Sequence, residues 1–423
     1  MKRPSILTDF SLLKHNANFR HVFVARTLSL LTIGMLVVAI PKQVYDLTQD
    51  SLSVAIAMAC EGVAMFIGLL LGGVLSDQKD RKKIILFARS VCGLGFFTLM
   101  LNALLEHASL WAIYVLSAWD GFFGALGVTA MMAIMPNIVG RENIVQARAI
   151  SMVSVRLATV IAPALGGILI AWLNVAWVYA IASLGTLLTV ITLLKLPPLL
   201  PKVLAEKKHP VQQLLQGFQF VLNNKVVGCT VLIGTLLSFS SAIRILFPQM
   251  VEQQFSGGAL QLGLLYSAVP LGATLGALLS GWTTPLKRPG WILLLSCVAI
   301  FSCMILFGLS PWFWLSCGLL VVFGYLMAIA NLLQYSIVQG HTPDQYAGRI
   351  NAIWLAQDAS GDSIATTLMG TLTRFLPIST SIACFGTFSL ALIIGCLLRF
   401  KSIRQTSFQD PALQEAEMNA DKA

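Results

Sequence analysis

Charged residues are scarce in this chain of 423 residues: Asp, Glu, Lys and Arg together make up 11% of it, whereas apolar residues make up 57%. The mean hydropathy is +0.81. A water-soluble protein of this size needs far more polar side chains to cover its surface. The composition therefore excludes a soluble globular protein and predicts a chain that is solvated largely by lipid.

The sequence also lacks the usual signatures of metal, redox and hydrolase sites. Its eight cysteines fall within long apolar runs, at spacings that match no metal or redox motif. Its five histidines fall outside those runs, so no His–carboxylate–nucleophile set is available within a membrane. We therefore expect no metal and no cofactor, and cysteines that serve as small packing residues.

Long apolar runs recur from one end of the chain to the other. An apolar helix of about 20 residues crosses a bilayer, and we expect about twelve such helices. The first should remain in the mature protein, because residues 1–21 are polar and basic, unlike a cleavable signal. The expected spans are 22–40, 52–75, 84–104, 110–136, 150–173, 175–195, 226–250, 260–282, 290–308, 312–339, 350–373 and 379–399.

Basic residues are concentrated in alternate connectors. Nearly all of the 28 Lys and Arg residues lie in the tails or after the even-numbered spans, five of them after the second span, whereas the opposite side carries only Lys42 and Arg374. Because basic connectors stay in the cytoplasm, we expect both termini there. The net charge of +10 then reflects topology and anionic lipid, and we expect no nucleic-acid partner.

A segment rich in proline and lysine divides the chain, with six expected spans before it and six after it. Its stretch from Val211 to Leu222 is amphipathic and should lie along the cytoplasmic face. A weak echo between Gln146–Arg156 and Tyr346–Gln357 favours a duplication, which places a binding site between the two halves near mid-membrane. The expected divisions are an N-terminal bundle at 1–196, a linker at 197–225, a C-terminal bundle at 226–400 and a cytoplasmic tail at 401–423.

Seven ionisable side chains are expected inside the spans. Each would cost about 2.5–3.5 kcal/mol if it faced lipid, so they should face one another or a water-accessible cavity. Three are cations and four are acids, and an acid without a partner is a natural proton carrier. These residues are Arg26, Glu61, Asp120, Arg156, Arg244, Asp358 and Asp362.

Depth and helical spacing single out some of these residues. Asp120 lies mid-span, with two glycines following on the same face. Trp354, Asp358 and Asp362 are spaced by four and share one face, where an aromatic ring beside two acids and opposite arginines suits a bulky aromatic ligand. Ion pairs between helices remain an alternative for Glu61 and Asp120, as does snorkelling to the membrane surface for Arg26 and Arg156.

The connector from Gly72 to Lys83 (GGVLSDQKDRKK) resembles a motif of the major facilitator superfamily. That motif is Gly-x-Leu-x-Asp-x-x-Gly-Arg-(Lys/Arg). Asp80 stands where the family usually has Gly, which leaves the loop geometry open. The chain resembles this superfamily throughout, which implies an all-α integral membrane protein with twelve transmembrane helices in two six-helix bundles.

The resemblance also implies residues that gate the transport pathway. Asp77 would rest against a helix start in the opposite half, braced by Arg81, and so hold the cytoplasmic side closed. On the fifth span, APALGG resembles the Gly-Pro motif of antiporters, in which a proline lets the helix bend; ordinary small-residue packing is the alternative. The gating residues implied in this way are Gly73, Asp77, Arg81, Lys82, Pro163, Gly166 and Gly167.

Further segments are similar to siderophore exporters within this superfamily, among them VFVAR (22–26), WDGFFGALGVTA (119–130) and AQDASGD (356–362). This similarity implies proton-driven export of the catecholate siderophore enterobactin across the bacterial inner membrane. It leaves open a hand-off to outer-membrane efflux components. A multidrug or lipid-like small-molecule carrier of the same superfamily is the main alternative.

A membrane-embedded prenyltransferase or acyltransferase is an alternative from another class. Asp358 and Asp362 resemble half of a metal–pyrophosphate motif, because two acids one turn apart can share Mg²⁺. The other acid pair, Asp77 and Asp80, is surrounded by basic residues. We therefore do not expect an enzyme.

Overall fold

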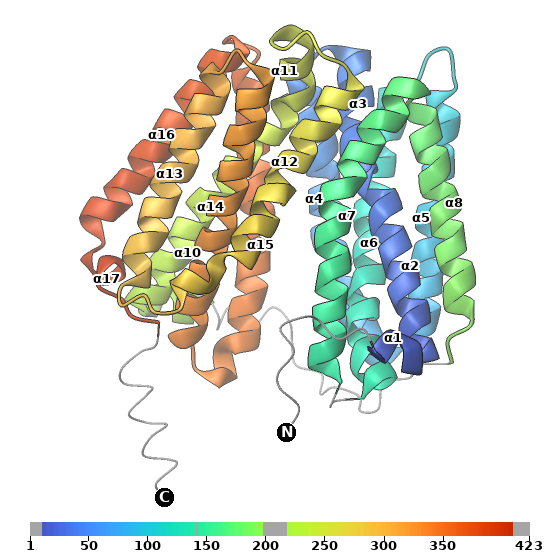
Figure 1. The fold of residues 1–423 in the computed structure, drawn as a ribbon, viewed down its shortest axis with the longest axis horizontal. Helices are drawn as coiled ribbons and strands as arrows, with labels where there is room; N and C mark the ends of the chain where they lie inside the picture. Colours follow the sequence, from blue (N-terminus) through green and yellow to red (C-terminus); the bar gives the residue numbers. More distant parts are fainter. Residues whose placement is uncertain (1–10, 141–142, 198–217, 409–423) are drawn as a thin grey trace, which may run out of the picture. The chain divides into compact units, whose positions relative to one another are not determined.

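The computed structural model describes residues 11–140, 143–197 and 218–408, and these residues are almost entirely helical (Figure 1). Their contacts divide the chain into two compact units. Unit 1 consists of residues 1–206 with 251–267, and unit 2 of residues 207–250 with 268–423.

Unit 1 is a bundle of long helices whose starts are capped by polar side chains. Asn16, Asp50, Asp80 and Asn174 each accept a hydrogen bond from a backbone N–H in the first turn of a helix. The helices are α1 (Ser11–His15), α2 (Ala17–Gly34), α3 (Leu36–Thr48), α4 (Ser51–Gln78), α5 (Arg81–Ala103), α6 (Leu110–Val139), α7 (Ile144–Trp172) and α8 (Val175–Leu194).

Unit 2 is a second bundle, and α11 and α12 are shared between the two units. Its helices are α10 (Lys225–Ser238), the 3₁₀ segment η1 (Phe239–Leu246), α11 (Phe247–Gln253), α12 (Ala259–Leu278), η2 (Ser280–Thr283), α13 (Pro289–Leu309), α14 (Phe313–Gly340), α15 (Asp344–Leu372), α16 (Ile378–Arg399) and α17 (Lys401–Arg404).

In the described part of the chain, 11 helical stretches are long and apolar enough to cross a membrane. The remaining expected span corresponds to α15, which has 29 residues. Its length suffices for a crossing, but its acids and amides lower its hydropathy. The chain is thus a multi-pass membrane protein with the helix content of the major facilitator fold.

Two expected spans are not continuous helices. The first extends from Ala17 to Thr48 and breaks at Met35, next to Gly34, whose backbone closely approaches Ala162 of α7. The expectation of one continuous helix over 226–250 was also wrong, because α10 passes into the 3₁₀ segment η1.

Local hydrogen bonds explain why the chain forms a 3₁₀ helix at η1. The hydroxyls of Ser238 and Ser240 donate to carbonyl oxygens three residues earlier, at 2.8 and 2.7 Å. Such bonds compete with the α-helical pattern. Pro248 then has no N–H with which to continue an α-helical ladder.

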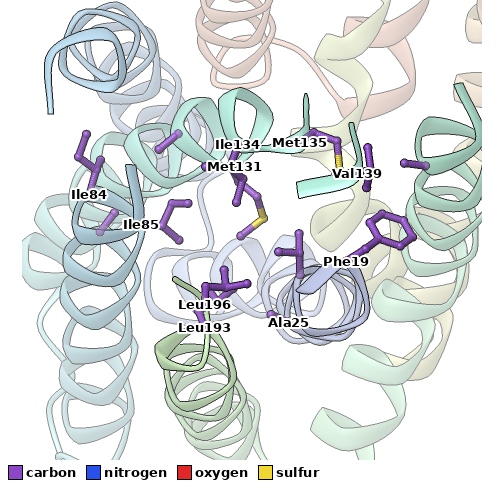
Figure 2. Packing of buried hydrophobic residues seen from close by; sticks show 14 of the residues in the cluster. Phe19, Ala25, Ile84, Ile85, Met131, Ile134, Met135, Val139, Leu193 and Leu196 are labelled. Carbon is purple, nitrogen blue, oxygen red and sulfur yellow. The ribbon is translucent and has the colours of Figure 1, made fainter. Parts of the chain in front are cut away.

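A dry apolar core joins α2, α5, α6 and α8 at the end of unit 1 where α2 begins. Asn16 ties this end to α6, because its side-chain amide donates to the carbonyl of Ile138 at 2.9 Å. Apolar burial of this kind contributes about 25 cal/mol per Å² relative to water. The core includes Phe19, Ala25, Ile84, Ile85, Met131, Ile134, Met135, Val139, Leu193 and Leu196 (Figure 2).

The short helix α17 folds back onto the end of α13. Ile403 is fully buried, and its carbonyl oxygen lies 2.0 Å from the position that a Cβ on Gly290 would take. The buried Thr406 hydroxyl lies 3.4 Å from Nε2 of His341. Residues up to Thr406 are therefore packed as part of unit 2.

Candidate functional site

The connector between α4 and α5 is held by the side chains of Asp80 and Arg81. The carboxylate of Asp80 accepts from the N–H of Lys82 at 3.0 Å, and Nε of Arg81 donates to the carbonyl of Ser76 at 2.9 Å. Asp80 thus takes the place of the usual glycine by capping α5. The side chain of Asp77 lies outside the described part of the structure, so the proposed latch stays a prediction.

Lys82 joins this connector to the end of α8. Its ammonium donates to the carbonyl of Leu194 at 2.9 Å and also to that of Leu196. These carbonyls belong to a helix C-terminus, which favours a cation. Gly73, by contrast, has no heavy atom within 4 Å of the position of a Cβ.

The APALGG motif on α7 lies where this helix closely approaches two other parts of the chain. A Cβ on Gly166 would lie 3.0 Å from the carbonyl oxygen of Met35, at the break between α2 and α3. A Cβ on Gly167 would lie 2.5 Å from the carbonyl oxygen of Ala259 in the first turn of α12. The two glycines therefore permit backbone approaches that no other residue would allow.

The same part of α12 receives the carbonyl of Pro163, which lies 2.7 Å from the position of a Cβ on Gly263. Nearby, the side-chain amide of Gln253 donates to the Tyr45 hydroxyl at 3.1 Å. Tyr45 is fully buried. These contacts tie α3, α7 and the start of α12 together within unit 1.

Arg89 is a buried charge that the sequence analysis missed. It was counted with the basic connector after the second span, but the Asp80 cap starts α5 at Arg81, which puts Arg89 two turns inside the helix. It is 5% exposed. The tally of three cations against four acids was therefore wrong, because Arg89 is a fourth cation.

Asp120 on α6 faces Arg89 and Cys92 on α5. The Asp120 carboxylate lies close enough to Cys92 and Arg89 to interact electrostatically with both. Asp120 is 9% exposed and Cys92 is fully buried. The Trp119 ring nitrogen donates to the carbonyl of Val91 at 2.9 Å and so fixes the two helices beside the cluster.

In unit 2, α15 and η1 bring an ion pair together. Nη2 of Arg244 donates to Oδ1 of Asp362 at 2.9 Å, and the Ser241 hydroxyl donates to the same oxygen. The side chains of Arg244 and Asp362 are 37% and 34% exposed. The pair is thus anchored by η1 but not sealed from its surroundings.

Asp358 and Trp354 extend this site along α15. Asp358 is exposed and interacts electrostatically with both Asp362 and Arg244, so two carboxylates share one guanidinium. The Trp354 ring packs on Tyr335 of α14, with centroids 5.1 Å apart. The expected face of α15 therefore carries two acids and Trp354, whose ring is paired with Tyr335 of α14.

The other three ionisable residues expected inside the spans lie on three different helices. Arg26 on α2 is partly exposed and repels Arg89 electrostatically, so it belongs with the Asp120 cluster. Glu61 on α4 is partly exposed, and its backbone carbonyl lies against Gly121 of α6. Arg156 lies partly exposed on α7.

Comparison with known proteins identifies a sequence family whose profile matches this chain. The profile of a major facilitator family described as transmembrane secretion effector matches residues 8–421. The chain is 45% identical to the enterobactin exporter EntS of Escherichia coli O1:K1 over 409 residues, which cover 96% of this chain and 98% of that protein. It is 46% identical over 407 residues to the enterobactin exporter EntS of Citrobacter koseri, covering 95% and 97%.

Solved structures show the fold alone. The nucleoside transporter NupG superposes with a TM-score of 0.74 at 14% identity, covering 91% of this chain and 99% of that one. A bacterial homologue of the lysosomal transporter Spinster, in an inward-facing and unoccupied conformation, gives a TM-score of 0.69 at 13% identity, covering 92% and 96%.

Proposed function

The chain belongs to the transmembrane secretion effector family, and from this premise we propose that it exports enterobactin from the cytoplasm to the periplasm in exchange for protons. The observation that carries the proposal is the 45% identity over almost the full length of a relative named as an enterobactin exporter. The proposal assigns the chain no catalysis and no cofactor.

The site of Arg244, Asp362, Asp358 and Trp354 suits the chemistry of a catechol. A catechol is a planar ring with two adjacent oxygens, so it can stack on an indole, donate to carboxylates and accept from a guanidinium. The Trp354–Tyr335 pair provides the aromatic surface, and Arg244 provides the donor. Together they support recognition of one arm of the siderophore.

The two carboxylates beside Arg244 support proton coupling. Because Asp362 is paired with Arg244, Asp358 has no cation of its own among the described residues and can take up a proton without breaking the ion pair. We propose that the α15 acids release their proton to the cytoplasm when cargo is taken up and regain one from the periplasm.

The proposed cycle places both termini in the cytoplasm, in an inner-membrane carrier with two six-helix halves. Gly73, Asp77, Arg81 and Lys82 would gate the cytoplasmic end. Pro163, Gly166 and Gly167 would let α7 move against its neighbours, a role supported by the close contact of Gly167 with α12.

The test is secretion by cells. A bacterial strain that makes enterobactin but lacks its exporter should retain catechol in the cytoplasm, and this gene should restore catechol to the medium. A variant with the Arg244→Gln substitution serves as the transport-deficient control at matched membrane levels. If the intact gene leaves extracellular catechol at the level of the empty vector, the cargo is not enterobactin.

A further inference from the structure

Unit 1 buries the guanidinium of Arg89 without satisfying it. Nε has no hydrogen-bond partner in the described residues, and the side chain forms no ion pair there. Asp120 acts on it through charge, but the two side chains form no ion pair among those of the described residues. A cation buried in this way is costly unless an anion compensates it.

A second guanidinium increases the imbalance. Arg26 on α2 lies close enough to Arg89 for the two charges to repel each other, and it is partly exposed. Among the described residues that interact with Arg89 through charge, Arg26 is the second cation and Asp120 is the only carboxylate. The cluster carries one excess positive charge within the span, which is the charge that a single oxyanion would neutralise.

Two glycines of α6 lie beside these buried charged groups. A Cβ on Gly124 would lie 3.6 Å from Oδ1 of Asp120, and a Cβ on Gly127 would lie 3.6 Å from Nε of Arg89. A side chain longer than alanine at either position would lie against these polar atoms. The glycines therefore keep bulky side chains of α6 out of the space beside Arg89 and Asp120.

We propose that Arg26 and Arg89 form an oxyanion subsite in unit 1, which binds a catecholate or carboxylate oxyanion of the cargo. Asp120, which acts on Arg89 through charge, is the positioning residue for Arg89. A guanidinium presents parallel N–H groups that match two adjacent oxygens, as in an ionised catechol. The identity of the cargo rests on the proposed function, whereas the anion specificity rests on the cluster itself.

Binding of two small probes to the full-length purified protein tests this subsite. Dihydroxybenzoate is an anionic catechol, and catechol itself is its neutral counterpart. Arg89→Gln and Arg26→Gln should each weaken binding of dihydroxybenzoate at least about tenfold, equivalent to roughly 1.4 kcal/mol. In both variants the affinity for catechol should change by less than about twofold.

Matched controls separate binding from folding. Arg148→Gln removes an exposed arginine from the start of α7 and should leave both affinities unchanged. Arg89→Lys retains the charge and should recover part of the affinity for dihydroxybenzoate. If Arg89→Gln does not fold, Arg26→Gln and Arg89→Lys carry the test.

Unchanged affinity for dihydroxybenzoate in Arg89→Gln and Arg26→Gln would overturn the proposed subsite. Equal losses of affinity for dihydroxybenzoate and catechol would also overturn it, because they would indicate that the arginines act through packing. The proposed function is judged separately by enterobactin secretion from cells. Failure of secretion by the unaltered protein, with the probe results intact, would reject the cargo but retain the anion site.

Discussion

Asp362 shares one carboxylate oxygen between Arg244 and Ser241, and both partners lie in η1. Asp362→Asn keeps the shape but removes the charge that compensates Arg244 and its capacity to carry a proton. We expect siderophore secretion to fall about tenfold or more, with membrane insertion intact, since loss of a charged partner costs more than about 1.4 kcal/mol. Extracellular catechol, normalised to membrane protein level, measures this.

The matched control for that substitution is Glu106→Gln. Glu106 is an exposed acid in the loop between α5 and α6, so its neutralisation should leave secretion unchanged. Secretion at the normal rate from Asp362→Asn would remove Asp362 from the mechanism.

Single residues also show where sequence reasoning reached its limit. Asp120, Asp358 and Asp362 could be recognised because acids in apolar runs are costly. Arg89 was missed although it lies inside the expected span 84–104, because it was counted with the basic residues of the preceding connector. The pairing of Arg244 with Asp362 joins residues 118 positions apart, which spacing alone cannot predict.

Lys82 stabilises the contact between two elements, the start of α5 and the end of α8. Lys82→Met should lower the free energy of unfolding by about 1–2 kcal/mol, because the last carbonyls of α8 lose a charged donor. Thermal unfolding of the purified protein measures this. Lys83→Met, at an exposed neighbouring lysine, should have little effect; equal midpoints for the two variants would contradict the capping role.

The contact of α7 with the start of α12 depends on glycine. Gly167→Ala places a methyl group 2.5 Å from the carbonyl oxygen of Ala259, so the helices must separate. We expect a loss of about 1–3 kcal/mol in unfolding free energy, as for other overpacked contacts. The change in thermal midpoint is the measurement.

Gly318→Ala is the control for this contact, because no heavy atom lies within 4 Å of the added methyl group. It lies inside α14 and should stabilise that helix by up to about 1 kcal/mol. Should both alanine variants shift the midpoint equally, the close approach at Gly167 would not constrain the fold.

At the level of whole helices, sequence reasoning succeeded where the bilayer sets the length. The expected span at 175–195 matches α8 at Val175–Leu194. It failed at Met35 and in η1, where glycine contacts and serine hydroxyls override the hydrophobic pattern. Hydropathy registers the apolar run but not a local change in hydrogen bonding.

The whole molecule should respond to the proton gradient. If protons drive export, a protonophore should stop uptake of radiolabelled enterobactin into inverted membrane vesicles, whereas a chelator of divalent cations should not. We expect the energised rate to fall at least about tenfold, because without a gradient the carrier only equilibrates its cargo. A rate that survives the protonophore would contradict antiport.

Architecture alone does not specify the cargo. A structure titled as a nucleoside transporter superposes on this chain at 14% identity, and one titled as a POT family transporter at 13%. Such folds carry many functions, so selectivity must come from the side chains placed inside them. For this chain we propose that those are the side chains of the Arg244 site and of the subsite at Arg26 and Arg89.

The burial of Ile403 determines where a reporter or affinity tag can be attached. A fluorescent domain joined directly after Arg399 would displace the turn that packs under Gly290 and leave its apolar surface open to detergent or chaperones. Fusion beyond Thr406 keeps that turn in place. Shortening this end of the gene is therefore expected to reduce yield even though no membrane crossing is removed.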